Sequence, residues 1–253
     1  MNKAEGNHKT KSISIVVPVF NEERNIQELY RRLGKVMMTL DYLYEVIFVD
    51  DGSKDKSLSV LTEIRKTDDR VKFISFSRNF GHQIAITAGM EYASGDAIIV
   101  MDADLQHPPE MLPNLIEKWE EGFEIVSTIR EDVKAVGFFK KLTASVFYKL
   151  INRISHTEIQ ANAPDFRLLD RKVVNTLKLM KEQGRFVRGL IGWVGFNQTF
   201  IKFVADKRYA GTTKYSLKKM MKFAFDGITA FSAFPLRIAT HLGVVATIIP
   251  LPY

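Results

Sequence analysis

Apolar residues in the first half of the chain alternate between a spacing typical of strands and a spacing typical of helices. Short apolar runs at residues 13–18 and 44–50 enclose a segment in which Ile26, Leu29 and Leu33 recur at helical spacing. The alternation continues through strand-like runs at residues 71–76, 97–101 and 123–128, with helical segments near residues 58–64, 82–92 and 111–119 between them. This pattern predicts an α/β protein with a largely parallel sheet and helices on both of its faces.

The pattern changes beyond about residue 130. A phenylalanine-rich helical stretch at residues 138–154 precedes a loop and a further strand and helix at residues 166–180, and a second amphipathic stretch covers residues 216–231. Residues 242–253 carry no charge, but a run of about a dozen residues is shorter than the roughly 20 that a membrane-spanning helix needs. We predict a polar tail at 1–11, one α/β domain at 12–210, and at 211–253 amphipathic juxtamembrane helices and the truncated start of a membrane segment.

Composition narrows the class of protein. The chain has 253 residues, of which 46% are hydrophobic, and this is enough for a sizeable core. Absence of cysteine rules out disulfides and thiolate zinc sites, and the polar start lacks the apolar stretch of a secretory signal. The formal net charge of +7 favours an anionic partner. Much of the excess lies at residues 202–222, which we interpret either as a phosphate or membrane contact or as a solvated face.

A first pair of aspartates, Asp50 and Asp51, follows the apolar run at residues 45–49. Ligands of open α/β sheets bind outside the carboxyl ends of the strands, where these carboxylates could accept hydrogen bonds from a base or from ribose hydroxyls. The alternative is a plain Asp-Gly-Ser turn in which Ser53 or Asp55 caps the next helix. The first crossover has no G-x-G-x-x-G motif, so a dinucleotide site is not supported.

A second pair, Asp102 and Asp104, follows the apolar run at residues 96–100. Two carboxylates at this spacing suit Mg²⁺ or Mn²⁺ bridging a diphosphate, although the same segment could be a loop that leads into a helix with Pro109 in its first turn. Because the same residue types occur after two strands, we favour the functional interpretation of both pairs. We expect His107 to be a loop residue, since no second histidine stands at metal-ligand spacing.

Several cationic side chains are candidate phosphate contacts, because a guanidinium group offers a bidentate fork and an ammonium group a point charge. They are Arg130, Arg167, Arg188, Arg208 and Lys214. Lone arginines usually lie on the surface, but Arg208 and Lys214 belong to a loop of small residues flanked by aromatics that could fold over a substrate. Asp165 stands at the edge of an apolar run and could instead form a buried ion pair with Arg167.

Six motifs follow one another in a fixed order along the chain. They are IVVPVFNEE (15–23), VDDGSKD (49–55), FSRNFGHQIAITAGM (76–90), MDADLQHPPE (101–110), NAPDFRLLDR (162–171) and RYAGTTKYSLKKM (208–220). Together they resemble the motifs of the polyprenyl-phosphate glycosyltransferases, relatives of dolichol-phosphate mannose synthase within the inverting family-2 glycosyltransferases. The resemblance implies a GT-A fold for the catalytic domain at 12–210, and metal-dependent transfer of a sugar from a nucleoside-diphosphate sugar to a polyprenyl phosphate.

The resemblance implies that the aspartate pairs bind the donor. Pro18, Asp50 and Asp51 would line the nucleoside pocket. Asp102 and Asp104 would hold Mg²⁺ or Mn²⁺ together with the diphosphate.

The resemblance implies that other motif residues serve the sugar and the acceptor. Gln106 would lie near the sugar, Arg130 would face the acceptor phosphate, and Asp165 would stand at the reaction centre. Arg208 and Lys214 would belong to a mobile loop that closes over the donor and acceptor phosphates.

The expected donors are UDP-glucose and UDP-N-acetylglucosamine, with undecaprenyl phosphate as acceptor, because the short loops and the Asp-Phe-Arg motif look closer to bacterial enzymes than to the GDP-mannose type. A GDP-mannose donor, a soluble or polysaccharide acceptor, and a non-catalytic nucleotide- or lipid-binding module are the alternatives. Family members continue into transmembrane helices, so the resemblance implies a multi-pass full-length protein at the cytoplasmic face of the cell membrane. We expect no nucleic-acid partner, and the membrane-facing helices could also form homo-oligomer contacts.

Overall fold

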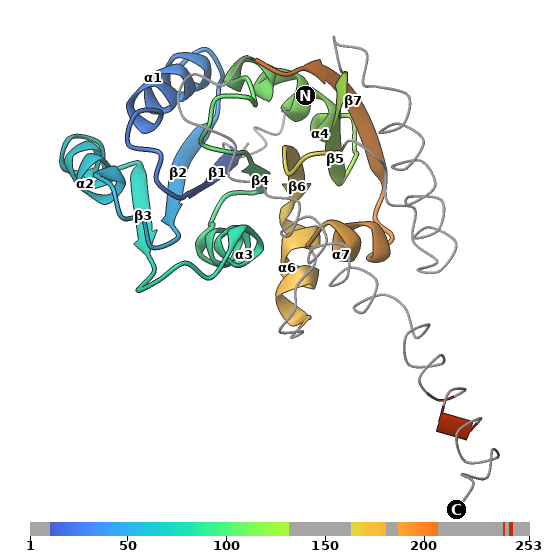
Figure 1. The fold of residues 1–253 in the computed structure, drawn as a ribbon. Helices are drawn as coiled ribbons and strands as arrows, with labels where there is room; N and C mark the ends of the chain where they lie inside the picture. Colours follow the sequence, from blue (N-terminus) through green and yellow to red (C-terminus); the bar gives the residue numbers. More distant parts are fainter. Residues whose placement is uncertain (1–10, 132–162, 181–186, 207–239, 241–242, 245–253) are drawn as a thin grey trace, which may run out of the picture. The chain divides into compact units, whose positions relative to one another are not determined.

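The computed structural model of the chain describes residues 11–131, 163–180, 187–206, 240 and 243–244 (Figure 1). The expected amphipathic stretches at 138–154 and 216–231, together with Arg208 and Lys214, lie outside these residues. The chain divides into two units: Met1–Lys134, Asn162–Lys181 and Phe196–Gly211 form the first, and Ala135–Ala161, Glu182–Gly195 and Thr212–Tyr253 form the second. The predicted domain boundaries stay a prediction.

Seven strands of the described residues form one mixed sheet in the first unit, in the order β3-β2-β1-β4-β6-β5-β7. They are β1 (Ser12–Val19), β2 (Leu43–Asp50), β3 (Val71–Ser75), β4 (Ala97–Val100), β5 (Ile125–Glu131), β6 (Arg167–Asp170) and β7 (Gln198–Val204). The pairings β1–β2, β1–β4, β2–β3 and β5–β7 are parallel, as the sequence pattern predicts. Strand β6 corrects that prediction, because it lies antiparallel between β4 and β5.

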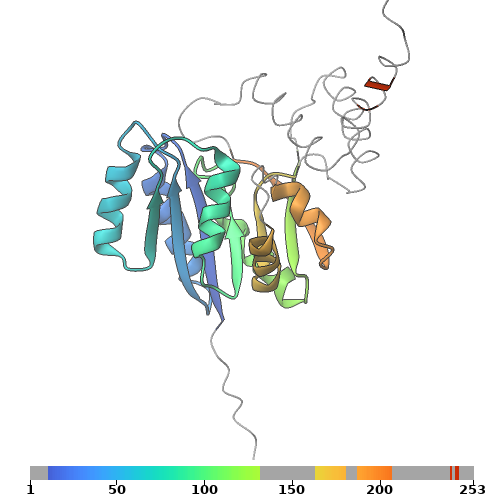
Figure 2. The same ribbon diagram turned by 90° about the horizontal axis from the view of Figure 1, so that it is seen from below.

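Helices cover both faces of this sheet (Figures 1 and 2). They are α1 (Ile26–Met37), α2 (Ser57–Thr67), α3 (His82–Tyr92), the 3₁₀ turn η1 (Pro109–Met111), α4 (Leu112–Glu120) and α6 (Arg171–Leu179). Helices α1 and α4 lie on one face, and α3 and α6 lie on the other, so the two-faced α/β arrangement is confirmed. The second unit contributes the helix α7 (Val187–Trp193).

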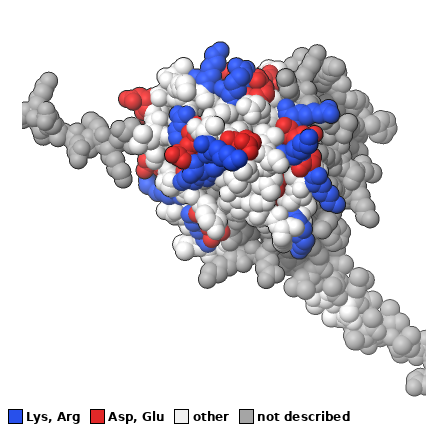
Figure 3. Space-filling model, turned by 90° about the vertical axis from the view of Figure 1, so that its left-hand side faces the viewer, with Lys and Arg blue, Asp and Glu red and all other residues white. Residues whose placement is uncertain are grey.

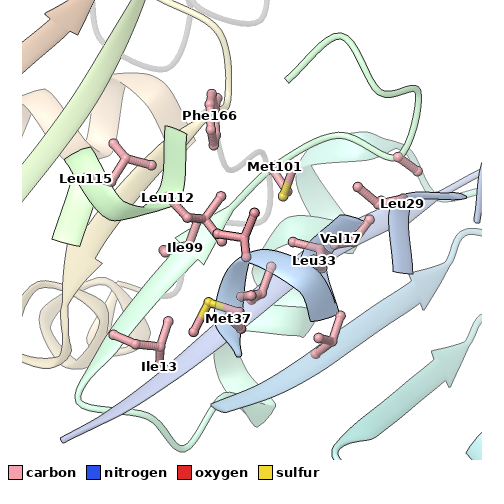
Figure 4. Close-up of a cluster of buried hydrophobic side chains, with 14 of the residues drawn as sticks. Ile13, Val17, Leu29, Leu33, Met37, Ile99, Met101, Leu112, Leu115 and Phe166 are labelled. Atoms are coloured by element: carbon pink, nitrogen blue, oxygen red, sulfur yellow. The ribbon is translucent and has the colours of Figure 1, made fainter. Parts of the chain in front are cut away.

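The core on the α1 face forms because successive side chains of each strand point to opposite faces of the sheet (Figure 4). Ile13 and Val17 of β1 point to the same side as Ile99 of β4, where Leu33 of α1 and Leu112 of α4 pack against them. All five side chains are fully buried, and each contributes about 1.5–3 kcal/mol to folding by leaving water. The helical spacing of apolar residues in α1 therefore fixes which of its sides contacts the sheet.

The strand order reverses between β1 and β4, and Pro18 opens the sheet at this point. The β1–β4 pairing ends at Val16 and Val100, where the Met101 N–H donates to the Val16 carbonyl oxygen at 3.1 Å. The next bond of a parallel ladder on this side would require an N–H at residue 18, which proline lacks. The residues after Val100 can therefore leave the sheet at the switch point, where open α/β sheets bind ligands.

The surface that carries α1 and α2 has mixed charge (Figure 3). Basic and acidic side chains alternate over it, in part as ion pairs such as Arg31–Glu28 on α1 and Lys66–Glu63 on α2. No helix of the described residues is long and apolar enough to cross a bilayer. Lys202, the first cation of the basic stretch, lies on β7 and pairs with Glu131 at 3.1 Å.

Candidate active site

The first aspartate pair lies at the carboxyl end of β2 and is buried. The Asp50 carboxylate accepts hydrogen bonds from the Ser53 N–H at 3.1 Å and from the Ser75 hydroxyl at 3.3 Å. Asp55 accepts a hydrogen bond from the Ser57 N–H at 2.9 Å, at the start of α2. The Asp-Gly-Ser turn weighed for this segment is therefore present, and any contact of Asp50 with a nucleoside would come in addition to it.

The Asp51 carboxylate holds the loop that precedes α3. It accepts hydrogen bonds from the N–H groups of Phe80 at 2.7 Å and Gly81 at 3.0 Å, and from the Asn79 side-chain amide at 2.8 Å. Burial raises the pKa of this carboxyl group, although the two backbone donors act in the opposite direction. These three donors occupy both oxygens, so the observed role of Asp51 is to tie the end of β2 to the start of α3.

Gly52 allows the loops after β2 and β3 to touch. Its φ of +69° lies in the left-handed region, which side chains rarely adopt. A Cβ atom here would lie 2.4 Å from the carbonyl carbon of Arg78 and 2.7 Å from the backbone nitrogen of Asn79. The close approach of these two loops thus requires glycine.

The second aspartate pair lies in a tight turn after β4. Asp104 is 8% exposed, its Oδ1 accepts a hydrogen bond from the Gln106 N–H at 3.1 Å, and Leu105 between them has a φ of +63°. The Asp102 side chain is more open, at 34%, but its Oδ1 is buried and has no hydrogen-bond partner in the described part of the chain. A buried carboxylate oxygen without a hydrogen bond is unfavourable, so this atom fits a site for a cation.

Asp165 is buried in front of β6 and is paired on both sides. Its Oδ1 lies 3.1 Å from Arg167 Nη2, and its Oδ2 accepts a hydrogen bond from the Gln83 amide at 3.1 Å. Arg167 is 4% exposed and also donates to the Pro164 carbonyl oxygen. The alternative of a buried ion pair is therefore correct, and Arg167 is not an exposed phosphate contact as its residue type suggested.

His82, in the first turn of α3, joins the two acidic segments. Its Nε2 lies 3.4 Å from Asp102 Oδ1 and 3.4 Å from Asp165 Oδ2. Three segments far apart in the sequence therefore meet at the switch point of the sheet. Among the described residues no cluster of three or more acidic or histidine side chains could hold a metal alone. An ion at Asp102 and Asp104 would take its other ligands from a diphosphate, the arrangement that Mg²⁺ prefers.

The remaining predicted site residues are distributed more widely. Pro18 is buried at the end of β1, and the Gln106 carbonyl oxygen accepts a hydrogen bond from the Asp206 N–H at 3.3 Å. Arg130 is exposed near the carboxyl end of β5, which β6 separates from β4. Arg188 lies on α7 in the second unit.

Sequence reasoning assigned no role to His82, Gln83 or Asn79. The available signal was their position, because all three follow β3 in the way that the aspartate pairs follow β2 and β4. Their partners are distant in the sequence: Asp51 is 28 residues from Asn79, and Asp165 is 82 residues from Gln83.

An α/β sheet with paired carboxylates at its switch point is typical of nucleotide-binding enzymes. Residues 14–178 match the family described as "Glycosyl transferase family 2". The chain belongs to this family and is a glycosyltransferase.

Individual relatives extend this similarity. The chain is 55% identical over 232 residues to "Uncharacterized glycosyltransferase YkcC" from Bacillus subtilis (strain 168), covering 92% of this chain and 72% of the relative. It is 44% identical over 241 residues to "Prophage bactoprenol glucosyl transferase homolog" from Escherichia coli (strain K12), covering 95% and 79%. It is 42% identical to "Bactoprenol glucosyl transferase" from Shigella phage SfV, covering 95% and 78%. The predicted resemblance to polyprenyl-phosphate glycosyltransferases is confirmed.

Solved structures share the fold. Mannosyl-3-phosphoglycerate synthase from Rubrobacter xylanophilus is similar with a TM-score of 0.59 and 14% identity, over 96% of this chain and 77% of that chain. Glucosyl-3-phosphoglycerate synthase from Mycobacterium tuberculosis, in complex with Mn²⁺, UDP and phosphoglyceric acid, has a TM-score of 0.57 and 18% identity, over 86% and 76%. The expected GT-A fold is thereby confirmed, whereas the juxtamembrane helices stay a prediction.

Proposed function

We propose that this chain transfers glucose from UDP-glucose to undecaprenyl phosphate, with inversion at the sugar carbon, at the cytoplasmic face of the membrane. The observation that carries the proposal is the meeting of Asp102 and Asp165 at His82, at the switch point of the sheet. The relatives named bactoprenol glucosyl transferase support the choice of sugar and lipid. UDP-N-acetylglucosamine is the second candidate donor.

The donor would bind across the crevice that Pro18 opens. Asp50 and Pro18 would line the nucleoside pocket, with Asp51 acting through the loop that it holds. Asp102 and Asp104 would hold Mg²⁺ or Mn²⁺, in agreement with the buried Asp102 Oδ1, which accepts no hydrogen bond in the described part of the chain. When bound, such an ion neutralises charge on the departing nucleoside diphosphate.

The acceptor requires no strong general base. The second pKa of a phosphomonoester is about 6, so the attacking oxygen is already mostly ionised at neutral pH. The larger difficulty is repulsion, since two unit charges 4 Å apart repel by about 4 kcal/mol at an effective dielectric constant of 20. Arg130, Arg208 and Lys214 would offset this repulsion, with Gln106 near the sugar. Asp165 would orient the reactants, a role consistent with its fixed pairing to Arg167.

The direct test is a lipid-extraction assay. The full chain is incubated with Mn²⁺, UDP-[¹⁴C]glucose and vesicles that contain undecaprenyl phosphate, and the organic phase is counted. We expect label in the lipid only when the polyprenyl phosphate is present, and none with Asp104→Ala. Parallel reactions with UDP-N-acetylglucosamine and GDP-mannose identify the donor. Label that passes only to water or to a soluble acceptor would contradict the proposal.

A further inference from the structure

His107 is a polar residue in the interior for which the proposed reaction has no use. Its side chain is 6% exposed. A neutral imidazole has one nitrogen that accepts a hydrogen bond and one that donates. Nδ1 is the acceptor, because it receives the backbone N–H of Asp102 at 3.0 Å.

The Asp102 N–H requires this acceptor because of the local strand geometry. The Met101 N–H bonds to β1, and successive N–H groups of a strand point to opposite sides, so the Asp102 N–H points toward the β6 side. The pairing of β4 with β6 ends at Val100 and Arg167, and the Asp102 N–H bonds instead to a side chain five residues further along the chain. The imidazole closes the turn that carries both Asp102 and Asp104.

The same ring also contacts the segment that carries Asp165. It stacks on Phe166 with a centroid distance of 5.0 Å and an interplanar angle of 11°, and it forms a T-shaped contact with Phe203 at a centroid distance of 5.9 Å. Phe166 is fully buried, and it stands next to Asp165 in the sequence. One side chain therefore contacts both acidic segments of the site, by a hydrogen bond on one side and by its ring face on the other.

We propose that His107 is a positioning residue that fixes the Asp102–Asp104 turn against Phe166 and thereby sets the affinity of the site for the donor diphosphate and its ion. This inference rests on the proposed function of that turn. A buried aromatic ring of the same size would fill the space equally well, so the hydrogen-bond acceptor Nδ1 is what distinguishes positioning from packing.

Two substitutions separate these contributions. His107→Asn places an amide oxygen close to the position of Nδ1, so it keeps the acceptor and loses the stacking. His107→Phe keeps the stacking and loses the acceptor. We expect His107→Phe to raise the KM for UDP-glucose about tenfold or more, with a smaller change in kcat. His107→Asn should stay within about threefold of the parent KM despite a lower Tm.

Phe203→Leu is the matched control, because it loosens the same aromatic cluster without removing the acceptor. It should lower Tm and leave the KM for UDP-glucose unchanged. An equal rise in KM for Phe203→Leu and His107→Phe, or an unchanged KM for His107→Phe, would overturn the inference.

Hydrogen–deuterium exchange of the metal-free chain provides a readout that is independent of turnover. Amides of residues 101–106 should exchange faster in His107→Phe than in the parent, in His107→Asn or in Phe203→Leu. Unchanged exchange in His107→Phe would overturn the positioning role even if the enzyme is active. Conversely, faster exchange in His107→Phe, combined with a parent chain that binds no UDP in the presence of Mn²⁺, would leave the role of His107 in the turn intact and overturn the proposed function instead.

Discussion

Single residues determine the site through the backbone shapes that they permit and the hydrogen bonds that they accept. Gly52 permits contact between two loops, Pro18 ends a ladder, and Leu105 adopts a left-handed φ between Asp104 and Gln106. A non-glycine residue with a left-handed φ destabilises the fold by about 1–3 kcal/mol, and such residues cluster at functional sites. The tightest constraints on the backbone thus coincide with the predicted donor-binding turns.

Gly52→Ala should destabilise the chain by about 2 kcal/mol or more, because a methyl group at positive φ would also meet the backbone of Arg78. Urea unfolding followed by circular dichroism measures the loss. Gly122→Ala is the matched control: its φ is +100°, but a Cβ there meets nothing within 4 Å, so only about 1 kcal/mol should be lost. Equal losses for the two variants would show that the loop contact is unimportant.

Asp165→Asn should retain measurable turnover, whereas Asp104→Ala and Arg208→Ala should lose far more. The reason is that an ionised acceptor phosphate needs no proton removed, so the amide can still orient it. Loss of a general base typically costs about 10²–10⁴-fold, and we expect less than about tenfold for Asp165→Asn. Single-turnover rates measured across pH decide the matter, and an Asp165→Asn variant as inactive as Asp104→Ala would refute the base-free mechanism.

The positions of the acidic pairs could be predicted from sequence, since carboxylates that follow apolar runs mark strand ends. Which atoms they contact could not be predicted. Asp51 bonds to a loop 28–30 residues away, and Asp165 bonds to Gln83 across 82 residues. Such hydrogen bonds depend on how α3 packs on the sheet, and the local spacing of apolar residues does not predict that packing.

At the scale of elements, close packing of α3 on the sheet places the first turn of the helix beside the acidic residues. Gly89 in α3 faces Val16 of β1, and a Cβ atom there would lie 2.2 Å from Val16 Cγ1 and 3.1 Å from Val49 Cγ2. The hydrophobic periods predicted this helix and most strands. They missed β7, in which Lys202 at the start of the basic stretch is the single charge, and they missed the direction of β6, since only a βαβ crossover dictates parallel pairing.

Gly89→Ala should destabilise the chain by about 1–3 kcal/mol, because overpacking forces α3 away from β1. It should also weaken UDP binding through movement of His82 and Gln83. Gly34→Ala on α1 is the matched control, since a Cβ there meets nothing within 4 Å and a helical alanine should stabilise by about 0.5–1 kcal/mol. Differential scanning calorimetry compares the two, and shifts of the same sign would contradict the packing account.

At the scale of the whole molecule, polar networks lie at both ends of the sheet. The network at the amino end of β2 surrounds Glu45, which accepts hydrogen bonds from the Ser14 hydroxyl at 2.6 Å, from the Ser94 N–H at 2.8 Å and from the Lys72 ammonium group at 2.6 Å. Burial opposes ionisation, but these donors outweigh it and lower the pKa of Glu45 to about 2. This end of the sheet stabilises the fold, whereas the carboxyl end carries the candidate site.

Stability should therefore fall as pH is lowered. The pKa of Glu45 is about 2 in the folded chain and 4.5 in the unfolded chain. The contribution of Glu45 to the free energy of unfolding is therefore complete above pH 4.5 and is lost as the pH falls toward 2. Glu45→Gln should lower Tm at neutral pH and flatten the dependence of Tm on pH in this window. Glu63→Gln, which removes an exposed carboxylate, is the control and should follow the parent. If Tm depends on pH as steeply in Glu45→Gln as in the parent, Glu45 is not the group that causes the loss of stability.

In the proposed function, Asp102 and Asp104 hold the divalent ion that binds the donor diphosphate. The most direct measurement is a crystal structure of the chain with Mn²⁺ and UDP, with anomalous scattering used to locate the manganese. We expect an ion bonded to an oxygen of Asp102 or Asp104 and to the diphosphate, with the uridine toward Pro18 and Asp50. Well-ordered UDP with its diphosphate elsewhere, or manganese bound away from both aspartates, would contradict it.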